Sequence, residues 1–143
     1  EKLPELISKI ETIKIRHNQP IILIGWSMGG LFSREVSHQR PDLISKVMTL
    51  GSPFGDIQAP NNAQWVFELL NDDYDVDHTL VLRLSSPVSM PSVAFYSKKD
   101  GIVPWEACMD KITDEHHLNV EIRSSHFGMG ANPSVLDAIV QNV

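Results

Sequence analysis

The sequence predicts an α/β protein with a mainly parallel sheet flanked by helices. Short apolar runs rich in β-branched residues alternate with segments of helical periodicity along the whole chain. These runs are apolar at every position, which is typical of strands that are buried on both faces of a parallel sheet. A length of 143 residues with 42% hydrophobic residues fits one domain with its own core.

The first half of the chain contains two expected helices and two expected strands. Residues 3–17 place Leu and Ile at helical spacing with charged residues between them, which predicts an amphipathic helix. Residues 21–24 form an apolar strand that is expected to be buried on both faces. A helix from Met28 to about Gln39 and a strand at 47–50 follow, and a Gly-Ser-Pro sequence ends that strand.

The second half begins with a less regular segment, residues 54–90, in which a short apolar helix is expected at 65–70. Regular alternation then returns. The expected elements are a strand at 93–96, a short helix opened by Pro104, a strand at 119–123, and a terminal helix that starts at Asn132-Pro133 with Asn as its cap.

Composition excludes several classes of function. Twelve basic and eighteen acidic residues give a net charge of −6, which disfavours nucleic acid as the main partner. The single cysteine, Cys108, cannot form an internal disulfide, and no Cys/His spacing suggests zinc, so no metal site is expected. No apolar run approaches the roughly 18 residues that span a bilayer. Nothing at the N-terminus resembles a signal peptide, which favours the cytoplasm without deciding the compartment.

The sharpest local motif is Gly25-Trp26-Ser27-Met28-Gly29, between an expected strand and an expected helix. A serine on such a tight turn forms a nucleophile elbow, with a strained backbone and its hydroxyl raised above the sheet. Gly25 and Gly29 are expected to remove side chains that would collide. The backbone N–H of Met28, at a helix N-terminus, is expected to stabilise an oxyanion. The alternative is a glycine-rich turn that serves only close strand–helix packing.

Asp100 is the best candidate for an acid that would orient a catalytic base. It follows the 93–96 strand by a few residues, at the strand end where such groups gather in α/β folds. Asp56, which follows the 47–50 strand, is the reserve candidate, whereas Asp110 and Asp114 are expected on helix surfaces. An ordinary Asp-Gly turn is the alternative for Asp100.

His126 is the best candidate for the base because it follows the last expected strand inside a stretch of small residues. Small neighbours allow a loop to turn an imidazole inward. His17 and His38 lie near helix ends, and the pair at 116–117 fits a solvated turn. The alternative for His126 is a structural histidine with satisfied hydrogen bonds.

Ser27, His126 and Asp100 together predict nucleophilic attack on an acyl carbon, with the imidazole as proton acceptor and the carboxylate as its partner. Because the imidazole must be neutral, activity is expected to rise with pH. Water would then hydrolyse the acyl-enzyme. Two alternatives remain: an acyltransferase or thioesterase with the same triad, and a non-catalytic binding module.

Four blocks of the sequence form a pattern when they are taken in order. They are Gly25-Trp26-Ser27-Met28-Gly29-Gly30, Leu50-Gly51-Ser52-Pro53-Phe54, Tyr96-Ser97 with Asp100-Gly101-Ile102-Val103, and Ser125-His126 with Gly128-Met129-Gly130-Ala131-Asn132-Pro133. Together these blocks resemble bacterial esterase/lipase-like α/β-hydrolases, over most of the chain apart from residues 57–90. The resemblance implies Ser27 as nucleophile, Asp100 as acid and His126 as base, with small-molecule or lipid ester substrates and no cofactor.

The same resemblance implies that residues 1–143 form the C-terminal half of such a domain, incomplete at the N-terminus. The missing part would include the loop that gives the second oxyanion donor. The apolar strand at 21–24 would then be an exposed edge and a point of self-association. A cap-like insertion is expected at about 57–90, with Trp26, Trp65 and Phe67 as candidate substrate contacts.

Overall fold

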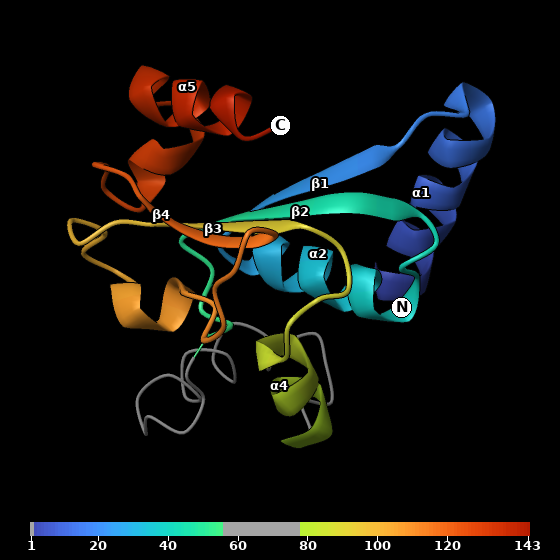
Figure 1. Ribbon diagram of the computed structural model, residues 1–143, viewed down its shortest axis with the longest axis horizontal. Helices are drawn as coiled ribbons and strands as arrows, with labels where there is room; N and C mark the ends of the chain where they lie inside the picture. The colour runs from blue at the N-terminus through green and yellow to red at the C-terminus, as the bar shows by residue number, and fades with distance from the viewer. Residues whose placement is uncertain (1, 56–77) are drawn as a thin grey trace.

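A four-stranded parallel sheet in the order β1-β2-β3-β4 organises the part of the chain that the structure describes. The computed structural model describes residues 2–55 and 78–143 (Figure 1). The strands are β1 (Ile21–Trp26), β2 (Ile44–Leu50), β3 (Ser92–Tyr96) and β4 (His117–Glu121). Each strand pairs with the next one along the chain, and helices flank the sheet, which confirms the predicted fold class.

The helices largely match the expectation from the sequence. They are α1 (Lys2–His17), α2 (Met28–Gln39), α4 (His78–Ser85) and α5 (Pro133–Gln141), with two short 3-10 helices, η1 (Trp105–Cys108) and η2 (Phe127–Gly130). The side chain of Asn132 accepts a hydrogen bond from the backbone N–H of Ser134, which confirms the predicted cap of α5.

Helix α4 was not predicted, because it lies in the segment that the sequence indicated to be irregular. Its apolar side chains Val81 and Leu84 are each 1% exposed and pack in a cluster with Leu31 and Ala94. Burial against α2 and β3 therefore stabilises a helix that has too few turns for a clear periodic pattern. The predicted helix at 65–70 and most of the predicted cap-like insertion lie outside the described residues.

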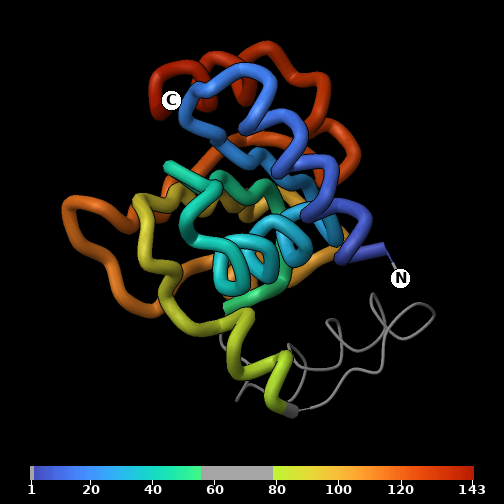
Figure 2. Tube along the Cα trace, turned by 90° about the vertical axis from the view of Figure 1, so that its right-hand side faces the viewer, coloured from blue at the N-terminus to red at the C-terminus, as the bar shows by residue number. Residues whose placement is uncertain are grey.

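Two apolar layers cover the two faces of the sheet. Leu23 and Val47 belong to one layer, which contains α1 and α2, whereas Met48, Val93 and Val135 belong to the other, which contains α5. Figure 1 shows α2 and α4 below the sheet and α5 above it, and the rotated view in Figure 2 again places α4 and α5 on opposite sides. The core is thus divided by the sheet, as expected for a helix–sheet–helix fold.

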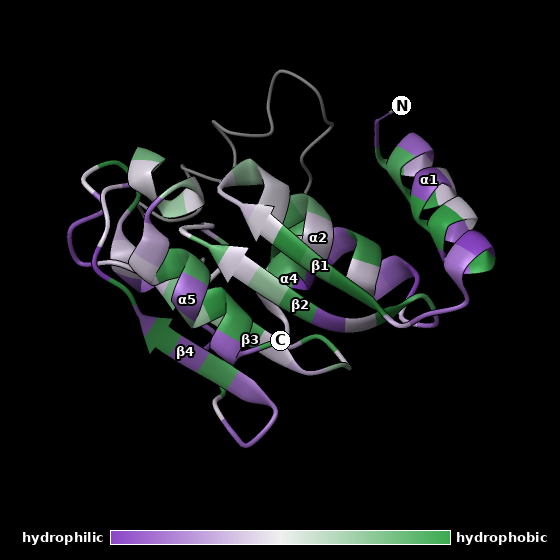
Figure 3. Cartoon of the chain, turned by 90° about the horizontal axis from the view of Figure 1, so that it is seen from above, coloured by the Kyte–Doolittle hydropathy of each residue, from purple (hydrophilic) through white to green (hydrophobic). Residues whose placement is uncertain are grey.

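Strand β1 departs from the predicted burial on both faces. It lies at the end of the strand order, and Ile24 is 50% exposed although its neighbours in the run are apolar. Figure 3 shows that α5 leaves β1 uncovered on this side of the sheet. An apolar run predicts that a strand can be buried, but the neighbouring elements decide whether it is.

The loops at the carboxyl ends of the strands meet at one edge of the sheet, since the arrowheads in Figure 3 point the same way. The turn at Ser27 follows β1, and the loop at 97–104 follows β3. The loop that holds His126 follows β4. This edge therefore gathers the residues that the sequence analysis singled out.

Candidate active site

Ser27 sits in a strained turn between β1 and α2. Its backbone has φ 53° and ψ −121°, in a region that L-residues with a side chain rarely adopt. The Ser27 N–H donates to the carbonyl of Leu50 at 2.9 Å, and the Ser27 carbonyl accepts from the N–H of Gly30 at 3.0 Å. Hydrogen bonds to β2 and within the first turn of α2 hold the residue in this conformation.

Of the two glycines that flank Ser27, only Gly25 has the role that the sequence suggested. A Cβ on Gly25 would overlap the backbone of Gly29 and lie 2.5 Å from the Cα of Gly30, so the predicted collision at Gly25 is confirmed. A Cβ on Gly29 would meet nothing within 4 Å, so the collision predicted there is wrong. Gly30 is the crowded position instead, because a Cβ there would overlap the hydroxyl of Ser52 and lie 2.7 Å from its Cβ.

The structure brings the three predicted site residues together. The Ser27 Oγ lies 3.0 Å from Nε2 of His126, and Nδ1 of the same ring lies 2.8 Å from Oδ2 of Asp100. Because a carboxylate only accepts, Nδ1 carries the proton and Nε2 is free to accept from the serine hydroxyl. His126 and Asp100 are buried, whereas Ser27 is half-buried. Of the three hydrogen-bonded side chains, only that of Ser27 is therefore in contact with solvent.

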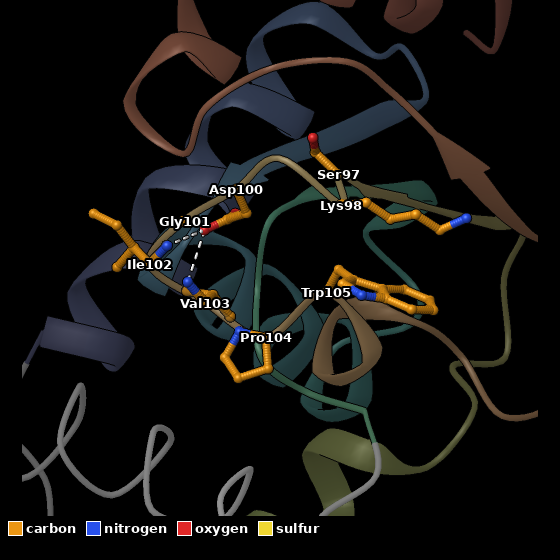
Figure 4. Close-up of a pocket in the computed structure, with 8 residues that line it drawn as sticks. All are labelled: Ser97, Lys98, Asp100, Gly101, Ile102, Val103, Pro104 and Trp105. Atoms are coloured by element: carbon orange, nitrogen blue, oxygen red, sulfur yellow. Dashed lines mark hydrogen bonds between the residues drawn. The ribbon is translucent and has the colours of Figure 1, made fainter.

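Asp100 is oriented by the backbone of its own loop. Its Oδ1 accepts from the N–H groups of Ile102 at 3.0 Å and Val103 at 2.7 Å, drawn as dashed lines in Figure 4. Gly101, with φ 77°, allows the chain to turn sharply enough for this double contact. The other oxygen, Oδ2, is thereby left for the imidazole of His126.

Backbone and serine contacts join the loop of Asp100 to the loop of His126. The N–H of His126 donates to the carbonyl of Asp100 at 3.0 Å. The hydroxyl of buried Ser97 donates to the carbonyl of Ser124 at 2.7 Å and accepts from its N–H at 3.2 Å. Sequence reasoning assigned no role to Ser97, although its place directly after β3 was a signal that could have found it.

Gly51 was also missed. It directly follows β2 with φ 54°, and a Cβ there would lie 3.0 Å from Oδ2 of Asp100 and 3.2 Å from Nδ1 of His126. The absence of a side chain at Gly51 leaves room for the carboxylate–imidazole pair. Its signal in the sequence was its place at a strand end, which is the criterion that selected Asp100.

The remaining predicted site residues are only partly placed. Met28 begins α2, where a backbone N–H has no carbonyl to bind within the helix, so its role as an oxyanion donor stays a prediction. Trp26 is 41% exposed at the end of β1, and its indole N–H donates to the carbonyl of His126 at 3.1 Å. Trp65, Phe67 and the reserve acid Asp56 lie outside the described residues.

Two other titratable groups differ from the expectation. Asp110 is not on a helix surface; it is buried and forms an ion pair with the buried guanidinium of Arg34 at 3.0 Å. His117 is not in a solvated turn, because its ring nitrogens contact Oδ1 of Asp114 and the carbonyl of Val88, each at 2.9 Å. Partial burial disfavours the charged ring, but these hydrogen bonds outweigh it and raise the pKa of His117.

An open depression of about 250 Å³ lies beside Asp100 (Figure 4). Neither Ser27 nor His126 lines it, so it is separate from the hydroxyl of Ser27. Within residues 2–55 and 78–143, no group of three or more His, Cys, Asp or Glu is placed to hold a metal ion, and no helix is long and apolar enough to cross a membrane. The residues around the depression are Ser97, Lys98, Asp100, Gly101, Ile102, Val103, Pro104 and Trp105.

A family model described as the alpha/beta hydrolase fold matches residues 14–86, which include the turn at Ser27. The chain belongs to the alpha/beta hydrolase fold family. This confirms the resemblance that four blocks of the sequence indicated. No match was found among curated proteins.

Solved structures show the same fold over nearly the whole chain. The monoacylglycerol lipase of Paleococcus ferrophilus is 15% identical with a TM-score of 0.65, over 97% of this chain and 74% of the lipase. The lipase BlEst2 of Bacillus licheniformis is 18% identical with a TM-score of 0.65, over 96% and 71%. A thioesterase domain from the curacin biosynthetic pathway is 13% identical with a TM-score of 0.59, over 96% and 70%. At these identities the likeness establishes that this alpha/beta hydrolase shares their fold.

Proposed function

We propose that this alpha/beta hydrolase cleaves carboxylic esters, with Ser27 as nucleophile, His126 as general base and Asp100 as its partner. One observation carries the proposal: an unbroken chain of hydrogen bonds, 3.0 Å and 2.8 Å long, runs from a half-exposed hydroxyl through an imidazole to a buried carboxylate. A chain of this kind activates a serine for acyl transfer.

The first half of the proposed reaction acylates the serine. As the Ser27 Oγ attacks the ester carbonyl carbon, its proton moves to Nε2 of His126, and Asp100 stabilises the resulting imidazolium. The carbonyl electrons move to oxygen, where the N–H of Met28 and the N-terminal end of α2 favour the negative charge. The C–O bond then breaks, and the alcohol leaves with the proton from Nε2.

The second half releases the acid. Water gives a proton to Nε2 of His126 and attacks the acyl-enzyme, and the same donors stabilise the second oxyanion. The proton then returns from Nε2 to the Oγ of Ser27 as the carboxylic acid departs. The cycle balances without a metal or a cofactor, since the ester supplies the acyl group and the alcohol, and serine, imidazole and water supply the nucleophiles and the protons.

Apolar esters are the substrate class that the surroundings favour. The ring of Phe127 lies next to the imidazole of His126, with a centroid distance of 5.8 Å, and it is 72% exposed. Exposed aromatic rings at a reacting centre bind uncharged acyl or alcohol groups better than charged ones. The likeness to two lipases supports the same substrate class.

Acyl transfer from a thioester, or to an alcohol or thiol, is the second candidate. The same three residues serve it, and the likeness to a thioesterase domain favours it. Competition between water and added alcohol or thiol for the acyl-enzyme, measured as the ratio of ester product to free acid, distinguishes the two reactions.

Labelling with a fluorophosphonate, which reacts with activated serines, tests the proposal. We expect one adduct per chain by intact mass, mapped to Ser27, and hydrolysis of short p-nitrophenyl esters by the same protein. Ser27→Ala should abolish both signals. His126→Gln should slow both by at least about a hundredfold, because the hydroxyl then lacks a base.

Ser8→Ala is the matched control, because Ser8 is exposed on α1 and far along the chain from the site. It should label like the parent protein. Labelling that persists in Ser27→Ala would contradict the proposal. A well-folded parent protein that neither labels nor hydrolyses esters would favour a binding module instead.

A further inference from the structure

Trp26 contacts the base of the proposed site in two ways. Its indole Nε1–H donates to the backbone carbonyl of His126 at 3.1 Å. Its ring lies against the imidazole, with centroids 5.6 Å apart and an interplanar angle of 41°. The residue directly before the nucleophile therefore holds both the backbone and the ring of the residue that would activate it.

The backbone N–H and the backbone carbonyl of His126 are both hydrogen-bonded to other elements of the site. Its N–H donates to the carbonyl of Asp100 at 3.0 Å, and its carbonyl accepts from Trp26. In the described part of the chain, the other hydrogen bond to this carbonyl comes from the N–H of Met129, at a longer 3.3 Å and within the same loop. Trp26 thus supplies the contact that ties the loop to the strand of the nucleophile.

The sheet itself does not set the distance between the hydroxyl and the imidazole. Ser27 follows β1 and His126 lies beyond β4, and these strands are at opposite ends of the order β1-β2-β3-β4. Ladder hydrogen bonds join only neighbouring strands, so any small shift across the sheet would change the Ser27–His126 distance of 3.0 Å. A direct bond from Trp26 to His126 spans the same gap beside the reacting atoms.

We propose that Trp26 is a positioning residue, which holds the imidazole of His126 in reach of the Ser27 hydroxyl, rather than chiefly a substrate contact. This inference rests on the proposed function. Small misplacements of a reacting group reduce rates strongly, up to about a hundredfold per ångström. Loss of one neutral hydrogen bond should cost about tenfold.

Trp26→Phe tests the inference, because it removes the indole N–H and retains an aromatic ring. We expect fluorophosphonate labelling and kcat for p-nitrophenyl esters to fall about tenfold, with KM within about twofold. The loss should be the same for acetyl, butyryl and octanoyl esters, since the ring of His126 and not the acyl chain is misplaced. Trp105→Phe is the matched control, because its ring stacks on Tyr96 at 5.5 Å, and it should label at the parent rate.

A second variant covers the case in which Trp26→Phe does not fold. Benzothienylalanine at position 26 has the shape of tryptophan with sulfur in place of the N–H, and it should show the same loss with an unchanged melting temperature.

Parent-like labelling and kcat in a folded variant would overturn the inference and leave the proposed function standing. A KM that rises with acyl length would overturn it as well, in favour of a substrate contact. A parent protein that does not label at Ser27 would instead overturn the proposed function, and the inference with it.

Discussion

Ser27 takes a backbone conformation that only its surroundings can sustain. A residue with a side chain at φ 53° and ψ −121° is strained by about 1–3 kcal/mol. Two glycines make the turn feasible, because a Cβ on Gly25 would overlap the start of α2 and a Cβ on Gly30 would overlap Ser52. The strain places the hydroxyl at 3.0 Å from His126, where the proposed chemistry needs it.

Alanine substitutions at the adjacent residues Gly29 and Gly30 should have different effects on the free energy of unfolding. Gly30→Ala should lower the free energy of unfolding by several kcal/mol, because the new Cβ overlaps the side chain of Ser52. Gly29→Ala meets no atom within 4 Å and lies in α2, so it should leave stability unchanged or raise it by up to about 1 kcal/mol. Urea unfolding followed by circular dichroism measures both.

A second substitution separates the clash from other causes. Ser52→Gly removes the two side-chain atoms that the new Cβ of Gly30→Ala would overlap and leaves the carbonyl oxygen of Gly25 at 3.1 Å, so the double variant should recover part of the lost stability. If Gly29→Ala were the more damaging change, the packing assigned to this turn would be wrong.

At the level of the elements, the buried guanidinium of Arg34 joins α2 to α4. Arg34 of α2 is 1% exposed; it donates to the carbonyls of Leu84 and Ser86 at 2.8 Å and 2.7 Å, and it pairs with Asp110. Its guanidinium carbon also lies 3.8 Å from the ring centroid of Phe54. One cation therefore binds the C-terminal end of α4 to α2, the helix that Ser27 precedes.

Removing this cation should destabilise the fold without a direct effect on the site. Arg34→Met leaves the buried carboxylate of Asp110 without its cation and removes the hydrogen bonds to the carbonyls of Leu84 and Ser86, so the free energy of unfolding should fall by about 3–5 kcal/mol. Arg34→Met combined with Asp110→Leu should be less destabilised than the single variant, because no charge is left buried alone. Urea unfolding of the two variants measures the difference.

Arg16→Met on α1 is the control, since Arg16 is exposed and the change should have little effect. A single variant as stable as the parent protein would contradict the role given to Arg34.

For the whole molecule, His117 makes stability depend on pH. Both ring nitrogens face oxygen acceptors, the carboxylate of Asp114 and the carbonyl of Val88, so the folded state favours the imidazolium. Partial burial opposes the charge, yet these bonds raise the pKa of His117. The hydrogen bonds from the 116–117 segment hold the pKa of Asp114 below its usual range.

The direction of the pH effect follows from linkage. Because the pKa of His117 is raised in the folded state, its imidazolium stabilises the folded state fully when the pH is below the unfolded pKa of about 6.5. This contribution to stability is lost as the pH rises through the pKa of the folded state. The contribution of Asp114 is lost at the acid end, as the pH falls through its depressed pKa. The parent protein should therefore lose more stability between pH 5 and pH 9 than His117→Gln does.

Urea unfolding at both pH values measures this difference, with His116→Gln as the control, because the side chain of His116 is 63% exposed. Equal pH slopes for the parent protein and His117→Gln would contradict the assignment.

The predictions that succeeded rest on local signals. Periodicity and turn residues predicted the bounds of α1 and α2, the parallel sheet, and the places of Ser27, Asp100 and His126 at strand ends. The errors concern long-range packing. Ile24 is exposed because no described helix covers it, and Asp110 is buried because Arg34 reaches it across 76 positions of the chain.

By itself, then, the sequence determined the class of fold and which loops could carry chemistry, because strand, helix and turn preferences act over a few neighbouring residues. Only the tertiary structure decided which glycine the turn needs, where Gly51 makes room, and that Trp26 holds His126. These features depend on contacts between residues up to 100 positions apart, and such contacts exist only once the sheet has brought the ends of its strands together.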